Sequence, residues 1–215
     1  MARRGNELSE HIIFAAKIVF LEMGFERASM DEIASRARTS KRSLYAHFKS
    51  KEKLYLAIID SARRIFLGRL KMPDDYSQNP TEALVIFCGR FQEVLIFTWT
   101  IKLCRLSIAE IDRFPKDSAQ YFDMMFAIPL ERLSNYMTQK LGYSRKTSAN
   151  AAHALLNTVV YPRFQRALFG LEPPLEQIDD ETISPNFDLE PVRKAVVELL
   201  ESFRGLPTTR ASKQE

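Results

Sequence analysis

The sequence predicts an all-α protein in which a small three-helix N-terminal region precedes a larger helical remainder. Apolar residues recur at helical spacing along most of the chain, and no stretch shows the strict alternation of a half-buried strand. Only 7 of the 215 residues are Gly, whereas 15 are Phe. A chain with little Gly and many large aromatic side chains favours helices packed around a bulky core.

The first three helices are predicted from local signals. The segment "HIIFAAKIVFLEMG" (residues 11–24) has apolar residues on one helical face and ends at Gly24. The segment "SMDE" (29–32) is a capping box that starts a second, short helix. After a break at residues 38–40, Thr39 or Ser40 can cap a third helix that turns Leu44 and Phe48 inward. Two short helices joined by a tight turn predict a helix-turn-helix motif over residues 29–48.

The net charge of +4 is concentrated near the N-terminus. Residues 1–53 contain 11 Lys and Arg against 7 Asp and Glu, whereas residues 54–215 contain 20 of each kind. Between residues 36 and 53, seven Lys and Arg side chains accompany a single acid, Glu52. A concentrated positive field suits a polyanionic partner, although a charge run by itself is more often a solvated surface.

The third helix is predicted to present a polar face. With Leu44 and Phe48 inward and about 100° per residue, Arg42 and Ser43 lie on the opposite side. Short polar residues and one Arg fit a major groove walled by phosphates. The starts of the second and fourth helices are also candidate phosphate sites. Taken singly, each of these residues is more often an ordinary surface or core residue, but together, with the cap spacing, they favour the groove-contact interpretation.

The segment "AAKIVFLEMGFERASMDEIASRARTSKRSLYAHFKSKEKL" resembles the N-terminal DNA-binding region of the TetR family of bacterial transcriptional regulators. The resemblance covers residues 12 to about 58, and "SMDEIA", "SKxxLYxHF" and "SKExL" are its specific parts. It implies a homodimer, a helical ligand domain and usually repression that a small molecule relieves. It also implies phosphate or groove contacts from Ser29, Met30, Thr39, Ser40, Lys41, Arg42, Ser43, Tyr45, His47 and Lys51.

Two positions depart from the family pattern. The family often has Gly in the turn and a second Gly after the lysine of the third helix, where this chain has Arg38 and Arg42. A left-handed Arg38 costs on the order of 1 kcal/mol, so a differently shaped turn is one expectation. Arg42 adds a donor fork on the groove-facing side that suits guanine O6 and N7.

The domain organisation follows from these elements. We expect a DNA-binding domain over residues 1–52, a helical ligand-binding and dimerisation domain over 53–205, and a disordered tail over 206–215. Within the second domain we expect a helix to about residue 70 and one long apolar helix from Thr81 to about Leu103. Residues 105–123 loosely resemble the C-terminal domains of AefR-like members of the family. The acidic segment 171–190 is expected to be a loop whose role is open.

Two sets of residues in the second domain are candidates for further contacts. Aromatic and Met side chains predict a pocket for a small apolar or aromatic ligand, although a plain core is the alternative: Phe87, Phe91, Trp99, Tyr121, Met124 and Met125. Helices at about 145–169 and 189–204 have the spacing of helix-pairing seams, although they could simply complete the monomer core. Their candidate dimer residues are Ala152, Leu156, Val159, Phe164, Val192, Val196, Leu199 and Phe203.

Other function classes have little support. The start of the chain lacks the apolar region of a signal peptide, and the apolar run at residues 94–104 is too short to span a bilayer. We therefore expect a cytoplasmic, nucleoid-associated protein without membrane contact. The His and Cys residues have no metal-ligand spacing, and no phosphate-binding Gly loop or nucleophile elbow occurs, so no catalytic residue, metal or cofactor is expected.

The expected function is a dimeric repressor. It would bind a palindromic double-stranded operator and be released by an unknown small-molecule inducer. The alternative is a ligand-insensitive or architectural DNA-binding protein, and a helical enzyme is the least supported reading.

Overall fold

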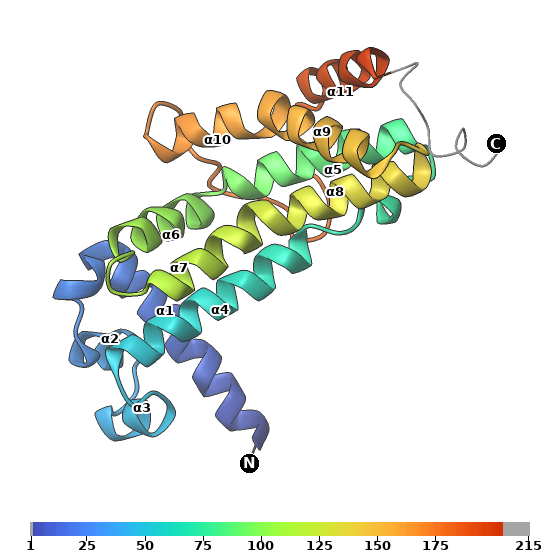
Figure 1. The fold of residues 1–215 in the computed structure, drawn as a ribbon. Coiled ribbons are helices and arrows are strands. Elements are labelled where there is room, and N and C mark those ends of the chain that lie inside the picture. The colour runs from blue at the N-terminus through green and yellow to red at the C-terminus, as the bar shows by residue number, and fades with distance from the viewer. Residues whose placement is uncertain (1, 204–215) are drawn as a thin grey trace. The chain divides into compact units, whose positions relative to one another are not determined.

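The computed structural model describes residues 2–203, with side chains from residue 6 onward, and the regular elements of this range are helical, as predicted (Figure 1). The expected tail 206–215 lies outside the described residues. None of the helices in the described range has an apolar stretch long enough to traverse a bilayer. The α-helices are α1 (Ala2–Arg27), α2 (Met30–Arg36), α3 (Lys41–His47), α4 (Lys51–Arg69), α5 (Pro80–Leu95), α6 (Thr98–Ala109), α7 (Pro115–Phe122), α8 (Ile128–Lys140), α9 (Arg145–Leu155), α10 (Tyr161–Leu168) and α11 (Glu190–Ser202).

The chain divides into two compact units that do not follow the order of the sequence. Unit 1 comprises Met1–Ile65 and Lys102–Tyr121, and unit 2 comprises Phe66–Ile101 and Phe122–Glu215. Unit 1 thus contains α1, α2 and α3, most of α4, the second half of α6 and nearly all of α7. Segments far beyond residue 52 therefore pack with the predicted N-terminal helices.

An aromatic cluster explains why residues 102–121 belong to unit 1. The ring of Phe114 stacks on Tyr55 of α4 with centroids 4.5 Å apart and meets Phe25 of α1 edge-on at 5.4 Å. Phe25 also contacts Tyr55 edge-on at 5.5 Å. All three rings are buried, and burial raises the pKa of the Tyr55 hydroxyl to about 12. Phe114 therefore completes the core beneath α1 and α4.

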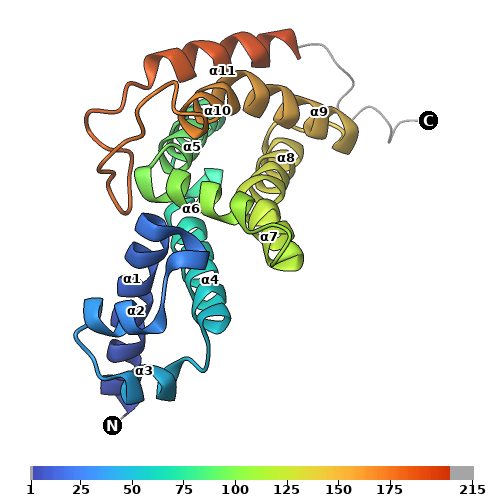
Figure 2. The same cartoon turned by 90° about the vertical axis from the view of Figure 1, so that its left-hand side faces the viewer.

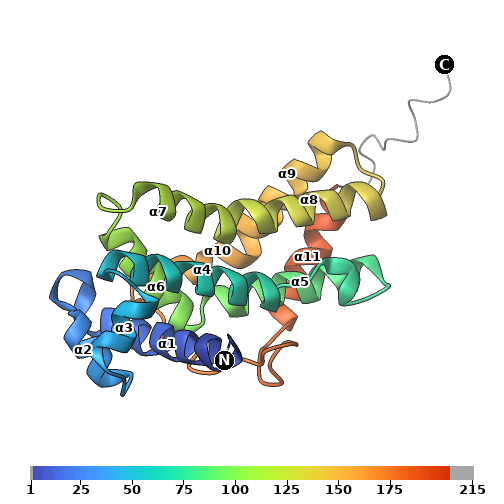
Figure 3. The same ribbon diagram turned by 90° about the horizontal axis from the view of Figure 1, so that it is seen from below.

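Helix α5 is the central element of unit 2. Its side chains are buried from Ala83 to Leu95 except Ile86, as expected for a helix that is apolar nearly all round. It contacts α10 and α11, and α8 packs along α9. Figures 2 and 3 show α11 lying across α9, and α8 beside α9, within this unit.

The predicted single helix from Thr81 to about Leu103 is wrong, because the chain breaks between α5 and α6. The carbonyl oxygen of Ile96 accepts from the amide of Leu175 at 2.9 Å, and the amide of Thr98 donates to the carbonyl oxygen of Leu175 at 2.9 Å. These bonds form an isolated parallel bridge between Phe97 and Leu175. Because a distant segment takes the helical bonding groups, apolar periodicity alone could not reveal the break.

Two prolines are accommodated by π-helical turns. A π-helix at Asp123–Ala127 precedes Pro129, and a second at Leu156–Val160 precedes Pro162. A proline ring clashes with the carbonyl four residues earlier, and the wider π turn relieves that clash without ending the helix. The path from α7 to α8 and the path from α9 to α10 therefore stay helical throughout.

The acidic segment 171–189 forms the predicted loop, and a buried ion pair fastens it to α5. Arg90 and Glu93 are both fully buried, with Nη1 of Arg90 2.7 Å from Oε2 of Glu93. The other oxygen of Glu93 accepts from the amide of Ser184 at 3.1 Å. The remaining donors of Arg90 bind the carbonyl oxygens of Arg69, Asp179 and Asp180 at 3.0, 2.8 and 3.1 Å.

This ion pair gives a testable prediction about stability. Glu93→Gln should lower the free energy of unfolding by about 3–5 kcal/mol, because it leaves the Arg90 charge buried without a counter-ion. The same substitution at Glu82, whose pair with Arg193 is about one-third exposed, should cost under about 1 kcal/mol. Urea unfolding of both variants measures the difference, and limited proteolysis should cut 171–189 faster only in Glu93→Gln. Equal losses of unfolding free energy for the two variants would contradict the conclusion that the buried pair of Arg90 and Glu93 fastens the loop.

Candidate nucleic-acid interface

Helices α2 and α3 are capped as the sequence predicts. The hydroxyl of Ser29 accepts from the amide of Glu32, and the hydroxyl of Ser40 accepts from the amide of Ser43, each at 3.1 Å. These bonds satisfy amides that have no partner within the first turn of a helix. Leu44 is fully buried and holds α3 against the core of unit 1. The predicted helix-turn-helix is therefore present (Figure 1).

The turn between α2 and α3 keeps the backbone of a glycine turn although it contains Arg38. The amide of Arg38 donates to the carbonyl of Ser35, and the amide of Thr39 donates to that of Ala34, both at 3.0 Å. This pair of bonds defines a Schellman motif, whose left-handed position is usually Gly. Arg38 occupies that position with φ 49°, at a cost of about 1–2 kcal/mol. The turn is thus strained rather than reshaped.

Helix α3 carries five of the ten predicted contact residues. Arg42, Tyr45 and His47 are exposed, whereas Ser43 is half-buried. Exposed residues also include Ser29, Ser40 and Lys41, and Thr39 is half-buried. Met30 differs from this pattern because its side chain is buried. Only the backbone of Met30, at the start of α2, remains for the predicted contact.

Two of the basic side chains in this region are already paired. Arg36 forms two hydrogen bonds with the carboxylate of Glu22, at 3.2 and 2.9 Å, and this pairing lowers the pKa of Glu22. The ammonium of Lys41 lies 2.7 Å from Asp31. Both pairs are solvent-exposed, so each neutralises charge locally while adding little to stability.

Lys51 has a structural role. Its ammonium donates to the carbonyl oxygens of Phe25, Glu26 and Ala28 at 2.8, 3.1 and 3.1 Å and lies 4.4 Å from the centroid of the Phe25 ring. A lysine has three N–H donors, and all three are used here. The predicted phosphate contact from Lys51 therefore has no free donor in this conformation, and we do not retain it.

Four of the seven Lys and Arg residues between positions 36 and 53 remain available. Within the described part of the chain, the side chains of Arg38, Arg42, Lys49 and Lys53 make no hydrogen bond or ion pair, and all four are exposed. The sequence predicts the basic cluster but not which of its side chains are paired, because partners such as Glu22 lie outside the cluster. Lys49 and Lys53 were therefore missed as candidate phosphate contacts.

The two roles of lysine can be separated by experiment. Lys51→Ala should lower the free energy of unfolding by roughly 2–3 kcal/mol, because three carbonyl oxygens lose a charged donor. Lys53→Ala should leave stability within about 0.5 kcal/mol but weaken DNA binding at every sequence and reduce its salt dependence. Urea unfolding and binding at several salt concentrations measure both effects. An unchanged unfolding midpoint for Lys51→Ala would refute the structural role.

The predicted pocket residues do not all lie in one unit. Phe87, Phe91, Met124 and Met125 are buried in unit 2, and Trp99 is half-buried there. Tyr121 is buried in unit 1, where desolvation raises the pKa of its hydroxyl. Phe91 contacts Phe66, Phe87 and Tyr161. The ligand prediction for these residues is untested.

Most of the predicted dimer residues are buried within the single chain. Leu199 and Phe203 are half-buried, and the other six side chains are 0–7% exposed: Ala152, Leu156, Val159, Phe164, Val192 and Val196. Side chains this deeply buried have little surface left for a second copy. The structure therefore favours the alternative that these six residues complete the monomer core.

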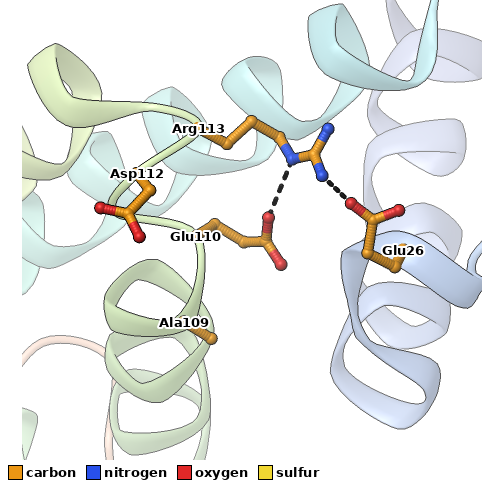
Figure 4. Close-up of a pocket in the computed structure, with 5 residues that line it drawn as sticks. All are labelled: Glu26, Ala109, Glu110, Asp112 and Arg113. Carbon is orange, nitrogen blue, oxygen red and sulfur yellow. Dashed lines mark hydrogen bonds and ion pairs between the residues drawn. The ribbon is translucent and has the colours of Figure 1, made fainter.

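A polar depression of about 450 Å³ lies in unit 1, lined by Glu26, Ala109, Glu110, Asp112 and Arg113 (Figure 4). Arg113 pairs with Glu26 of α1 and lies 3.2 Å from Glu110, while its guanidinium covers the Phe25 ring at 4.9 Å. The three carboxylates that line the depression would repel a polyanion, so this depression is not part of the candidate interface.

Comparison with known proteins gives the family of the N-terminal region. Residues 12–58 match the family described as bacterial regulatory proteins, tetR family. The transcriptional activator FasR of Mycolicibacterium smegmatis is 48% identical over 62 residues, which are 26% of this chain and 28% of FasR. The transcriptional repressor BepR of Brucella suis is 39% identical over 107 residues, 46% of this chain and 51% of BepR. The chain thus spans about half or less of these relatives.

The similarity of fold extends further than that of sequence. The solved structure of the flavonoid-responsive regulator FrrA has a TM-score of 0.67 to this chain at 24% identity, covering 92% of this chain and 95% of FrrA. At this level of identity the match establishes a shared fold. These relatives are transcriptional regulators, not enzymes.

Proposed function

We propose that this chain, whose residues 12–58 match the tetR family of bacterial regulatory proteins, is a transcriptional regulator that acts as a dimeric repressor of a palindromic operator. A small apolar or aromatic ligand would release it from DNA. The observation that carries the proposal is the outward face of α3, where Arg42 is exposed and unpaired within the described residues and Leu44 anchors the opposite side.

Base recognition is assigned to the first turn of α3. Arg42 and Ser43 directly precede the buried Leu44 in α3, and an Arg fork can pair bidentately with guanine O6 and N7. Tyr45 and His47 flank them, and Lys49 and Lys53 follow α3 with free ammonium groups for phosphates. A dimer would place two such helices in major grooves about 34 Å apart, which matches a palindromic site.

A selection experiment tests this assignment. Purified protein should recover genomic fragments that share a palindrome, and Arg42→Ala should relax the preference at one position per half-site by about 1–3 kcal/mol. Lys53→Ala serves as the matched control, because a phosphate contact should weaken binding without changing base preference. Identical base preferences for wild type and Arg42→Ala would remove Arg42 from base recognition. Recovery of no fragment by the wild type would refute the proposed function.

Unit 2 is the proposed ligand-binding part. Its aromatic and Met side chains, including Phe87, Phe91, Met124 and Met125, offer apolar surroundings for such a ligand. FrrA, which shares this fold, is a flavonoid-responsive regulator. A ligand would act by favouring a state with lower operator affinity. It can shift the equilibrium only by the difference in its affinity for the two states.

Ligand release predicts reciprocal coupling. Once an inducer is found by thermal-shift screening of aromatic compounds, operator DNA should weaken inducer binding by the same factor that inducer weakens operator binding, typically 5- to 150-fold. Calorimetric titration with and without operator measures both factors. Equal inducer affinity in the two titrations would favour the ligand-insensitive alternative. In that alternative the protein binds DNA, and no ligand changes its affinity for the operator.

The dimer is proposed to use side chains other than the six buried candidates. Phe169 and Leu171, after α10, are 81% and 67% exposed, and Val197 of α11 is 38% exposed. Exposed apolar side chains of this size are suited to burial against a second copy.

A further inference from the structure

We infer that Arg38 supplies a contact to the DNA phosphate backbone from the turn between α2 and α3. This inference rests on the proposed function and extends it to a residue outside the predicted contact set. Three observations support it: the backbone strain at Arg38, its unpaired guanidinium, and its place directly before the helix proposed to read the bases.

The strain has no compensating contact within the protein. Arg38 holds the left-handed position of the Schellman motif with φ 49°, where Gly would fit without strain. Its side chain is exposed and, within the described residues, makes no hydrogen bond or ion pair. Strained backbone positions of this kind concentrate at functional sites. The guanidinium of Arg38 is therefore available to a partner outside the chain.

The surrounding charges support an anionic partner. Arg36 and Lys41, on either side of the turn, are paired with Glu22 and Asp31. Arg38 lies between these neutralised residues with a free guanidinium. No carboxylate of the described residues competes for it, so its charge is available to a phosphate.

The position of Arg38 in the turn before α3 favours contact with a phosphate group over contact with a base edge. Arg38 precedes Ser40, the N-cap of α3, by two residues, whereas Arg42 and Ser43 lie in the first turn of that helix. In helix-turn-helix docking the N-terminal residues of the second helix approach the bases. The preceding turn then faces the wall of the groove, which is made of phosphates. A guanidinium binds phosphate through two parallel hydrogen bonds.

The test compares Arg38→Gly with Arg38→Gln, using a genomic fragment recovered by the wild type and a scrambled duplex of equal length. Both variants should bind both duplexes roughly tenfold more weakly. The slope of log affinity against log salt concentration should fall in magnitude by about 0.9 per subunit. Arg38→Gly should also unfold about 2 °C higher, because it relieves the strain, whereas Arg38→Gln should unfold near the wild type.

Arg145→Gln is the matched control for net charge. Arg145 is exposed on α9, and its side chain has no partner among the described residues, so this variant should bind DNA as the wild type does. The inference is overturned if Arg38→Gly binds like the wild type, or if its affinity falls for the genomic fragment and not for the scrambled duplex. Failure of the wild type to bind either duplex would instead refute the proposed function, and this inference with it.

Discussion

The placement of α2 and α3 in unit 1, on which the proposed DNA contacts depend, rests on the three hydrogen bonds of one ammonium group. Helix α1 ends at Arg27, shortly after the non-helical Gly24 (φ 77°), so the carbonyl oxygens at and just after its end have no further helical turn to accept from. Lys51, the first residue of α4, binds three of them. It thereby joins the end of α1, the approach to α2 and the start of α4. An unpaired, partly buried carbonyl would be costly, so this lysine fixes the frame on which α2 and α3 are held.

The charge available to the proposed DNA partner is smaller than the charge of the sequence. Of seven Lys and Arg residues between positions 36 and 53, Arg36 and Lys41 are paired and Lys51 is internal. What remains free is concentrated in the turn, on α3 and just after it. Under the proposed function, phosphate and base contacts would come from few side chains, and each one would carry a larger share of affinity and specificity.

Unit 2 uses a buried ion pair where an all-apolar core would suffice for stability. Arg90 binds the carbonyl of Arg69, and Arg132 binds that of Leu70, so two guanidinium groups meet the C-terminal end of α4. Positive charge is favourable at a helix C-terminus. Arg90 also holds the loop 171–189 through Asp179 and Asp180. Within unit 2, a polar network of this kind holds α5, the loop and the last residues of α4 in one arrangement, because every member has a partner.

Local signals in the sequence determined the helical class, the cap at Ser29, the break at Gly24 and the inward Leu44, and they narrowed the cap of α3 to Thr39 or Ser40. Each depends on residues within a few positions of one another, so periodicity and capping rules suffice. Tertiary structure decided the rest: Phe114 joining the core of unit 1, Leu175 splitting the predicted long helix, Lys51 turning inward, and six predicted dimer residues completing the monomer core. These outcomes depend on partners distant in sequence, and the residue types alone do not say which partner each side chain will meet.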